Sequence, residues 1–376
     1  MIYKLYLLLF LFVFNFSIVI AQTYSISGNV TGFNDNIKVS LVDNDLESKI
    51  NHTTLKKGHF YLNGTLKNGP MYLTVVLHDE GKEYDCTVFV GNGKVQIKGS
   101  KKDFPYDIEV IGSTEQSKYN AYRNMLKDLN ISLDQKMQVY IKAKEKGDSI
   151  AALKAAIAYN AVGTEFRSIS KKWVLNNTDT YYGINELHDL LFQLNRDTIQ
   201  NIYASLSPQL KKSIYGKRIY TYLTIGDTLK INDRYFDFEA FDITGKNQQL
   251  STLDDKYILL DFSSIHCGPC EESIEELRML SHKYANQLRI VSFTSDNHAD
   301  WLQGIKKDHI TWISLSDGEG SYSKTLLKYG GQTIPKFYLI SPDGIIKDKW
   351  DSYEKLSSGT GEIEKRILKY LKAQQE

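Results

Sequence analysis

Hydrophobic and polar residues alternate in short runs along the first part of the chain, after a leading apolar segment. The runs at 25–30, 59–62 and 95–97 each predict a strand, and glycine-containing turns separate the runs. A period of two is typical of strands that bury one face. The pattern predicts a small antiparallel β domain over residues 22–112, arranged as a sandwich or a barrel.

The pattern changes in the next part of the chain, where glycine becomes sparse and apolar residues recur every three or four positions. This spacing is typical of helices that bury one face. In an alanine-rich stretch, Ile150, Leu153, Ile157 and Ala161 fall on one helix face. The sequence therefore predicts a packed helical region over residues 113–223.

Strands and helices alternate in the last part of the chain. A continuous apolar strand at 257–262 precedes a helix at 271–284, and a second strand follows at 288–294. The remaining pattern predicts two helices, a hairpin and a closing amphipathic helix, at residues 301–307, 322–329, 336–350 and 362–371. Such alternation predicts a mixed α/β sheet covered by helices over residues 224–376.

The leading apolar segment has the features of a secretory signal peptide. Lys4 precedes an almost unbroken apolar run at 5–20, which is shorter than the ~20 residues that a spanning helix needs. Val19 and Ala21 provide small residues for a signal peptidase at the end of the run. Residues 1–21 are therefore predicted to export a protein that is soluble after cleavage. The alternative is an uncleaved N-terminal anchor.

Composition narrows the classes of function. The 376 residues contain 46 Lys and Arg against 45 Asp and Glu, which gives a formal net charge of +1. This balance provides no general attraction to nucleic acid or to an acidic membrane surface, so no nucleic-acid partner is expected. The chain has three cysteines, too few for a disulfide-rich scaffold, and two of them lie close together.

The two neighbouring cysteines form the motif Cys267-Gly268-Pro269-Cys270, between the strand at 257–262 and the following helix. At a helix N-terminus, free N–H groups and the helix dipole favour negative charge, which predicts a pKa for Cys267 below the ~8.5 of a free thiol. Pro269 suits the first helical turn, because it has no N–H to leave unpaired. Cys270, one turn further on, is predicted to be the shielded resolving thiol. The motif therefore favours a redox-active dithiol that needs neither a metal nor a cofactor.

Two other interpretations of the cysteine pair stay open. A structural zinc site needs two more ligands, and Cys86 is the only other thiol in the sequence. His282 and His298 are separated by 15 residues, in contrast to the usual spacing of about three to five. The second interpretation is an inert structural disulfide.

The strand at 257–262 followed by CGPC resembles the thioredoxin fold. It is most similar to the TlpA/ResA-like thiol–disulfide oxidoreductases of bacterial cell envelopes, within the AhpC/TSA–redoxin superfamily. Three further segments resemble the opening hairpin, the proline loop and the final hairpin of that family, at residues 238–251, 333–335 and 341–344. The resemblance covers about residues 225–376. The β domain and helices upstream resemble a domain of uncharacterised role that often precedes such modules.

The resemblance implies roles for residues outside the cysteine motif. Pro335 would be a cis-proline that faces the cysteines, and a plain trans turn proline is the alternative. The backbone of Ile334 would pair with a substrate strand, and Thr333 would bind substrate from the same loop. His266 replaces the bulky residue common before the first cysteine, and it is a further candidate for substrate binding.

Asp261 lies six residues before Cys267, where thioredoxins place a buried aspartate. Burial within a strand would raise its pKa and suit it to accept a proton from Cys270 during resolution. The alternative is a strand-end aspartate that touches solvent. The strand at 290–294 contains no lysine to pair with Asp261, which departs from thioredoxin.

The favoured function is a cell-envelope thiol–disulfide oxidoreductase that reduces protein disulfides and is recharged by a membrane thiol-electron donor. A thiol peroxidase of the AhpC/TSA type is one alternative. Ser264 lies three residues before Cys267 as in such enzymes, but Leu260 occupies the position of their proline. The other alternative is a non-catalytic envelope protein whose upstream domains bind a partner.

Overall fold

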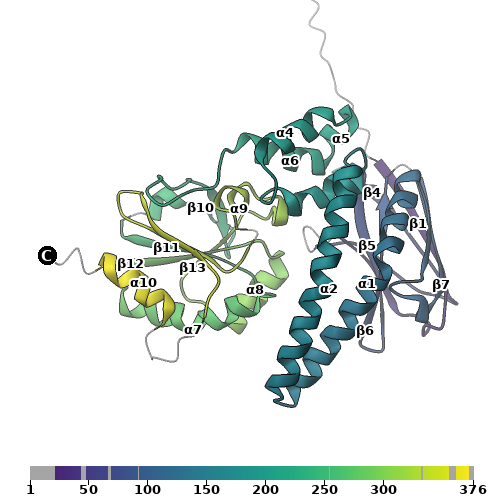
Figure 1. The fold of residues 1–376 in the computed structure, drawn as a ribbon, viewed down its shortest axis with the longest axis horizontal. Coiled ribbons are helices and arrows are strands. Elements are labelled where there is room, and N and C mark those ends of the chain that lie inside the picture. Colours follow the sequence, from purple (N-terminus) through teal and green to yellow (C-terminus); the bar gives the residue numbers. More distant parts are fainter. Residues whose placement is uncertain are drawn as a thin grey trace, which may run out of the picture.

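The computed structural model describes residues 22–43, 48–66, 69–91, 93–253, 255–331, 333–354 and 361–371. The segment 1–21, predicted to be a signal peptide, lies outside the described residues. In chain order, the protein forms a pair of β-sheets, a group of helices and a larger mixed sheet flanked by helices (Figure 1). Across the described ranges, no helix combines the length and the apolar character needed to cross a membrane.

Two four-stranded sheets form the first part of the molecule. Their strand orders are β4-β1-β7-β8 and β3-β2-β5-β6. Alternate side chains of both sheets, such as Ile26 and Leu41, are fully buried and meet in one hydrophobic cluster, so the sheets stack as a sandwich. The strands are β1 (Gln22–Thr31), β2 (Lys38–Asp43), β3 (Ser48–Thr54), β4 (His59–Leu66), β5 (Met71–Asp79), β6 (Lys82–Val90), β7 (Gly93–Ser100) and β8 (Glu109–Ile111).

One strand pair differs from the antiparallel arrangement that the sequence predicts. β1 and β7 pair in parallel, with Ile26 opposite Val95, whereas β1 and β4 pair antiparallel. Between β4 and β7 the chain passes through β5 and β6 of the other sheet. This crossover brings β7 back in the direction of β1, which a tight hairpin could not do. The spacing of apolar residues therefore predicted most of these strands, although not β3 and β8, and it did not predict their partners.

The helical part packs on the second sheet of the sandwich. The Tyr72 ring of β5 contacts Phe89 of β6, Tyr119 of α1 and Tyr182 of α3, so β5 is buried on both faces. The two long helices α1 and α2 form a hairpin that extends beyond the sheets (Figure 1). The helices are α1 (Thr114–Glu145), α2 (Ser149–Asn176), α3 (Tyr181–Glu186), α4 (Arg196–Ser205), α5 (Pro208–Lys212) and α6 (Ile214–Thr224).

The apolar face of α2 is not packed as the sequence predicts. Ile150, Leu153 and Ile157 are 70%, 63% and 62% exposed, whereas Ala152 and Ala155 are buried. Small side chains let α2 approach its neighbour α1 closely, so the alanine face is covered and the larger apolar residues remain at the surface. Helical spacing identified the apolar face of α2, but it could not decide which face of the helix is covered by its neighbours.

The third part is a seven-stranded mixed sheet in the order β10-β9-β13-β12-β11-β14-β15. Because side chains alternate along β11, Leu260 and Phe262 enter one hydrophobic cluster and Leu259 enters another, on the opposite face. Helix α9 packs on the first face, whereas α7 and α10 pack on the second. This part confirms the predicted mixed α/β sheet with flanking helices.

The predicted elements of the third part follow one another in the predicted order, and the sheet contains one further strand, β13, that the sequence did not predict. The strands are β9 (Glu239–Asp242), β10 (Asn247–Gln249), β11 (Tyr257–Ser263), β12 (Leu288–Thr294), β13 (Ile313–Ser316), β14 (Lys336–Ile340) and β15 (Ile346–Asp351). The helices are α7 (Gly268–Lys283), α8 (His298–Lys307), α9 (Lys324–Tyr329) and α10 (Glu362–Leu371). Short 3₁₀ turns occur at Lys101–Asp103, Leu187–Leu190, Leu250–Leu253 and Gly320–Tyr322.

The helical part contacts the third part through α6 and α9. Arg218 of α6 is 4% exposed and donates a hydrogen bond to Ser321 Oγ at 2.6 Å. Its guanidinium group lies 3.7 Å from the ring centroid of Tyr322. Lys328 of α9 donates to the carbonyl group of Ile225, just after α6. These contacts fasten the sheet that carries the cysteine motif to the helices before it.

Candidate active site

Cys267 and Cys270 lie at the start of α7 and are joined by a disulfide, with an S–S distance of 2.09 Å and a Cα–Cα distance of 5.2 Å. Cys267 is the N-cap residue, and its Sγ accepts a hydrogen bond from the Cys270 N–H at 3.2 Å. Pro269 occupies the first turn. Cys267 is partly exposed, whereas Cys270 is 2% exposed. Of the two sulfurs, Cys267 is therefore the one open to an incoming substrate.

The charge closest to the cysteine motif on α7 is compensated. Glu271 lies in the first turn of α7, where its carboxylate would oppose a thiolate at Cys267. It forms an ion pair with Lys307 of α8, with a distance of 2.9 Å between Nζ and Oε1. The helix N-terminus therefore remains favourable to a thiolate. The sequence did not reveal this pair, because the packing of α8 beside α7 brings the two residues together.

Asp261 lies in β11 on the same face as Leu259, toward α7, and is 1% exposed. Its Oδ2 accepts a hydrogen bond from Ser292 Oγ at 3.0 Å, and its Oδ1 accepts none within the described part of the chain. Burial raises the pKa of Asp261 to about 6, and the hydrogen bond from Ser292 limits the rise. Asp261 is thus a buried carboxyl group, and the solvent-exposed alternative is wrong.

The proline loop, residues 333–335, lies at the edge of the sheet where β11 ends and the chain continues to Cys267. β14 pairs antiparallel with β11, and Lys336 is opposite Phe262, so Pro335 lies near the end of β11. The Ile334–Pro335 peptide bond is cis, as the resemblance implies, and the trans alternative is wrong. Thr333 is exposed and Ile334 is partly buried. Their roles in substrate binding stay predictions.

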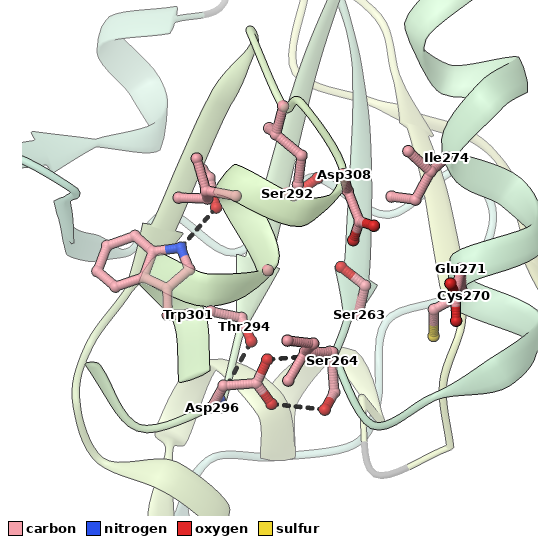
Figure 2. A pocket seen from close by; sticks show the side chains of 15 residues that line it. Ser263, Ser264, Cys270, Glu271, Ile274, Ser292, Thr294, Asp296, Trp301 and Asp308 are labelled. Atoms are coloured by element: carbon pink, nitrogen blue, oxygen red, sulfur yellow. Dashed lines mark hydrogen bonds between the residues drawn. The ribbon is translucent and has the colours of Figure 1, made fainter. Parts of the chain in front are cut away.

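Asp296, which no pattern in the sequence indicated, fixes the turn before the cysteine motif. It follows β12, is 7% exposed, and accepts hydrogen bonds from the Ser264 hydroxyl and from the Ile265 N–H (Figure 2). The Asp296 N–H in turn donates to Thr294 Oγ1 at 3.1 Å. A parallel pairing of β11 and β12 would have indicated Asp296. The carboxyl ends of parallel strands meet at one edge of a sheet, and Asp296 follows β12 as the cysteine motif follows β11.

His266, directly before Cys267, is exposed and contacts the N-terminal turn of α8. Its Nε2 lies 3.2 Å from Asp300 Oδ2, and the same carboxylate accepts a hydrogen bond from Asn297 Nδ2 at 2.7 Å. The contact holds the residue before the first cysteine against α8. A contact of His266 with substrate stays a prediction.

A cavity of about 40 Å³ lies beside the buried sulfur (Figure 2). Its lining includes Cys270 from α7, Ser263 from β11, Ser292 from β12 and Asp308 at the end of α8. Burial raises the pKa of Asp308. A cavity of this size can hold water, because one molecule needs ~10–15 Å³ of such space. The cavity therefore connects the shielded sulfur with the serine residues around Asp261.

Two segments of the chain match known protein families. Residues 231–349 match the AhpC/TSA family, and residues 24–119 match a domain of unknown function, DUF4369. The chain is similar to the thioredoxin-like protein YneN of Bacillus subtilis, with 26% identity over 116 residues, or 30% of this chain and 66% of that protein. It is also similar to the thiol-disulfide oxidoreductase ResA of Bacillus cereus, with 23% identity over 124 residues, or 33% of this chain and 70% of that protein.

Two solved structures of similar proteins cover 38% and 31% of this chain. The thioredoxin domain of a thiol-disulfide oxidoreductase from Bacteroides vulgatus is 20% identical, with a TM-score of 0.34 over 38% of this chain and 99% of that chain. A thiol-disulfide oxidoreductase from Bacteroides fragilis is 27% identical, with a TM-score of 0.30 over 31% of this chain and 89% of that chain.

The mixed sheet, the flanking helices and the CXXC disulfide define the C-terminal part as a thioredoxin-like domain of the thiol–disulfide oxidoreductase class. More narrowly, the chain combines a ResA- and YneN-like AhpC/TSA domain with an N-terminal DUF4369 domain. The resemblance drawn from the sequence is confirmed for both segments. The chain spans about two thirds of the length of the two relatives, 66% and 70%.

Proposed function

We propose that this protein is an exported thiol–disulfide oxidoreductase of the cell envelope that reduces disulfides in other proteins. The unequal access of the two sulfurs carries the proposal, since Cys267 is partly exposed at a helix N-terminus and Cys270 is buried behind it. The sequence pattern of residues 1–21 supports export. Residues 22–112 and 113–223 are proposed as a β domain and a helical region that share one hydrophobic core, followed by the oxidoreductase domain at 224–376.

The reaction proceeds in two exchange steps. The Cys267 thiolate attacks one sulfur of a substrate disulfide, so a mixed disulfide forms, the substrate S–S bond breaks and one substrate thiolate leaves. The Cys270 thiolate then attacks the Cys267 sulfur, and the second substrate thiolate leaves. The substrate gains two electrons, and the enzyme ends with the Cys267–Cys270 bond present in the structure. A membrane thiol-electron donor would reduce this bond again.

The loop before β14 would hold the substrate during the first step. Its position near the end of β11 suits the Ile334 backbone to pair with an extended substrate segment. Thr333 is exposed beside it, and His266 is exposed next to Cys267. These three residues are therefore the proposed substrate contacts.

Reduction of insulin by dithiothreitol tests the activity. The purified chain should accelerate the precipitation of reduced insulin B chains, and the Cys267→Ser variant should give the rate of dithiothreitol alone. Wild-type protein that is no faster than this variant would contradict the proposal. A chain lacking both thiols, C267S/C270S, tests the non-catalytic alternative, which requires that the double variant keep the cellular function.

The direction of electron flow is tested by the reduction potential of the Cys267–Cys270 pair, measured by titration with glutathione. A reductant should have a value near the roughly −270 mV of thioredoxin. A value near the roughly −120 mV of DsbA would reverse the direction to oxidation.

A peroxidase assay separates the proposal from the alternative within the same superfamily. Peroxidases of the AhpC/TSA type use a proline upstream of their reactive cysteine, and this chain has the buried Leu260 in that position. With hydrogen peroxide and a thiol donor, consumption by the wild type should not exceed that of Cys267→Ser. Faster consumption that depends on Cys267 would favour the peroxidase.

A further inference from the structure

Ser292 lies in β12, next to Asp261 in the neighbouring strand β11. The two residues are opposite each other in the parallel pair of β11 and β12, and the Ser292 hydroxyl lies 3.0 Å from Asp261 Oδ2. Ser292 is 3% exposed, so water from bulk solvent does not compete for this contact. A hydroxyl group can donate one hydrogen bond and accept others. Which role it plays toward Asp261 therefore depends on its second partner.

The second partner of Ser292 is Trp312, the residue directly before β13. Trp312 Nε1 lies 2.8 Å from Ser292 Oγ. An indole N–H can only donate, so the Ser292 oxygen accepts from Trp312 and its proton is left for Asp261. The chain of contacts is therefore directional: Trp312 donates to Ser292, and Ser292 donates to Oδ2 of Asp261.

The other carboxyl oxygen of Asp261 is left open. Within the described ranges, Oδ1 accepts no hydrogen bond although it is buried. Ser263 and Ser292, the two serines near the carboxyl group, line the cavity that reaches Cys270. A water molecule in this cavity can carry a proton from the Cys270 thiol to Asp261.

We propose that Trp312 and Ser292 are a positioning pair that engages one oxygen of Asp261 and leaves the other free to accept the proton of Cys270. The inference rests on the proposed function and specifies its second step. The Cys270 S–H bond breaks, the proton passes to Asp261, and the electron pair stays on sulfur. That sulfur then attacks Cys267, the Cys267–Cys270 bond forms, and the substrate thiolate leaves. Where thioredoxin has a lysine, this chain uses a neutral hydroxyl held by an indole.

Other titratable groups surround the same cavity and must be distinguished from Asp261. They are Glu271 from α7, Asp296 after β12 and Asp308 at the end of α8. Glu271 is paired with Lys307, and Asp296 is engaged by the turn before the cysteines. Asp308 has its pKa raised by burial and is therefore the competing proton acceptor.

The two steps can be timed separately with the reduced full-length protein and dithionitrobenzoate. Attack by Cys267 releases one thionitrobenzoate, and displacement by Cys270 releases a second, so stopped-flow absorbance gives a first and a second phase. The proposed function requires the first phase, and the positioning pair acts on the second. An absent first phase overturns the function, whereas a second phase insensitive to the pair overturns only the present inference.

The pH at which the rate of the second phase is half-maximal should follow the pKa of Asp261. A hydrogen bond to the carboxylate favours its charged form, so Ser292→Ala should move this midpoint to higher pH by about one unit. Trp312→Phe should move it in the same direction by about half as much, because the hydroxyl group remains but can turn away. Ser292→Thr, which retains the hydroxyl, should restore the wild-type midpoint. Asp261→Asn should slow the second phase and remove the pH dependence that has this midpoint.

Trp301 provides a matched control. It is 6% exposed and donates from Nε1 to Ser314 Oγ at 2.8 Å beside the same cavity (Figure 2). The hydrogen bond that Asp261 accepts comes from Ser292 and not from Ser314. Trp301→Phe should leave the midpoint unchanged. Equal shifts in the two tryptophan variants, no shift in Ser292→Ala, or loss of the midpoint in Asp308→Asn instead of Asp261→Asn would each overturn the proposal.

Discussion

Two buried carboxyl groups, one in the N-terminal sandwich and one in the thioredoxin-like sheet, have opposite surroundings. Asp79 is 2% exposed and accepts hydrogen bonds from Lys101 Nζ at 2.8 Å and from both the backbone and the side-chain N–H groups of Asn34. The hydrogen bond from Lys101 lowers the pKa of Asp79. Asp261 has a hydroxyl group on one oxygen, and burial raises its pKa. Both residues are buried, and their partners determine the direction of the shift.

The free thiol and the dithiol differ in the same way. Cys86 in β6 is 2% exposed, and burial raises its pKa to about 12, so it remains a neutral packing group. Cys267 is partly exposed and caps a helix N-terminus, which favours a thiolate. Within the described residues, Asp79 of the sandwich has donors on both carboxyl oxygens, whereas Asp261 of the thioredoxin-like sheet has one buried oxygen without a donor. Such groups cluster where chemistry takes place.

The largest expected effect is on the two kinds of thiol. Cys267→Ser should reduce disulfide exchange to the rate of dithiothreitol alone, because the attacking sulfur is lost. Cys86→Ala should leave the rate within about twofold of the wild type, because its side chain only fills the sandwich core. Insulin reduction measures both. A large loss of rate in a folded Cys86→Ala variant would remove the distinction between the two regions.

The two carboxyl groups should respond to neutralisation with opposite signs. The pKa of Asp261 rises from 3.8 to about 6 on folding, so the cost of ionising it grows as the pH rises between these two values and is complete above about 6. Asp261→Asn should therefore raise the free energy of unfolding at pH 7 by up to about 3 kcal/mol. This gain should vanish below about pH 4, where the unfolded aspartate is also protonated. Urea unfolding across this pH range measures it.

Asp79→Asn is the matched control and should lower the free energy of unfolding. The lowered pKa of Asp79 stabilises the fold above its unfolded value of 3.8, and this contribution is lost as pH falls through the folded value. The difference between Asp79→Asn and wild type should therefore be greatest near neutral pH and shrink in acid. Destabilisation by Asp261→Asn, or stabilisation by Asp79→Asn, would show that the hydrogen-bond partners of the two carboxyl groups do not explain their opposite pKa shifts.

The junction between the regions should have a smaller effect. Arg218→Ala removes a buried guanidinium group from Ser321 and from the ring of Tyr322, so the free energy of unfolding should fall by about 1–3 kcal/mol. If this contact couples the regions, calorimetry should also show broader or separate transitions. A single unchanged transition in Arg218→Ala would mean that the regions are held together by other contacts.

The smallest effect is expected on the exposed face of α2. Leu153 is 63% exposed, so Leu153→Ala should change the free energy of unfolding by less than about 0.5 kcal/mol. Ala155 lies on the covered face, and Ala155→Leu should cost about 1–3 kcal/mol by overpacking against α1. If urea unfolding showed a larger loss of stability in Leu153→Ala than in Ala155→Leu, the apolar face would be the packed one.

The candidate site was predictable to the extent that it depends on residues close in sequence. CGPC between a strand and a helix indicated the dithiol, and the spacing from Asp261 to Cys267 indicated the aspartate. Asp296, Lys307 and Trp312 were missed, because each approaches the site from a separate element. Local patterns contain no information about such approaches.

Alternation, helical spacing and turn residues act over a few positions, so the sequence was sufficient to predict most strands and helices in order, the dithiol and its proline loop, although β3, β8 and β13 were missed. The tertiary structure decided the parallel pairing of β1 with β7, the exposure of Ile150, Leu153 and Ile157, and the partners of Asp261. These features depend on which surfaces meet after the chain has folded. The ionisation of a buried carboxyl group is one of them, since desolvation and hydrogen bonding arise only when distant segments enclose it.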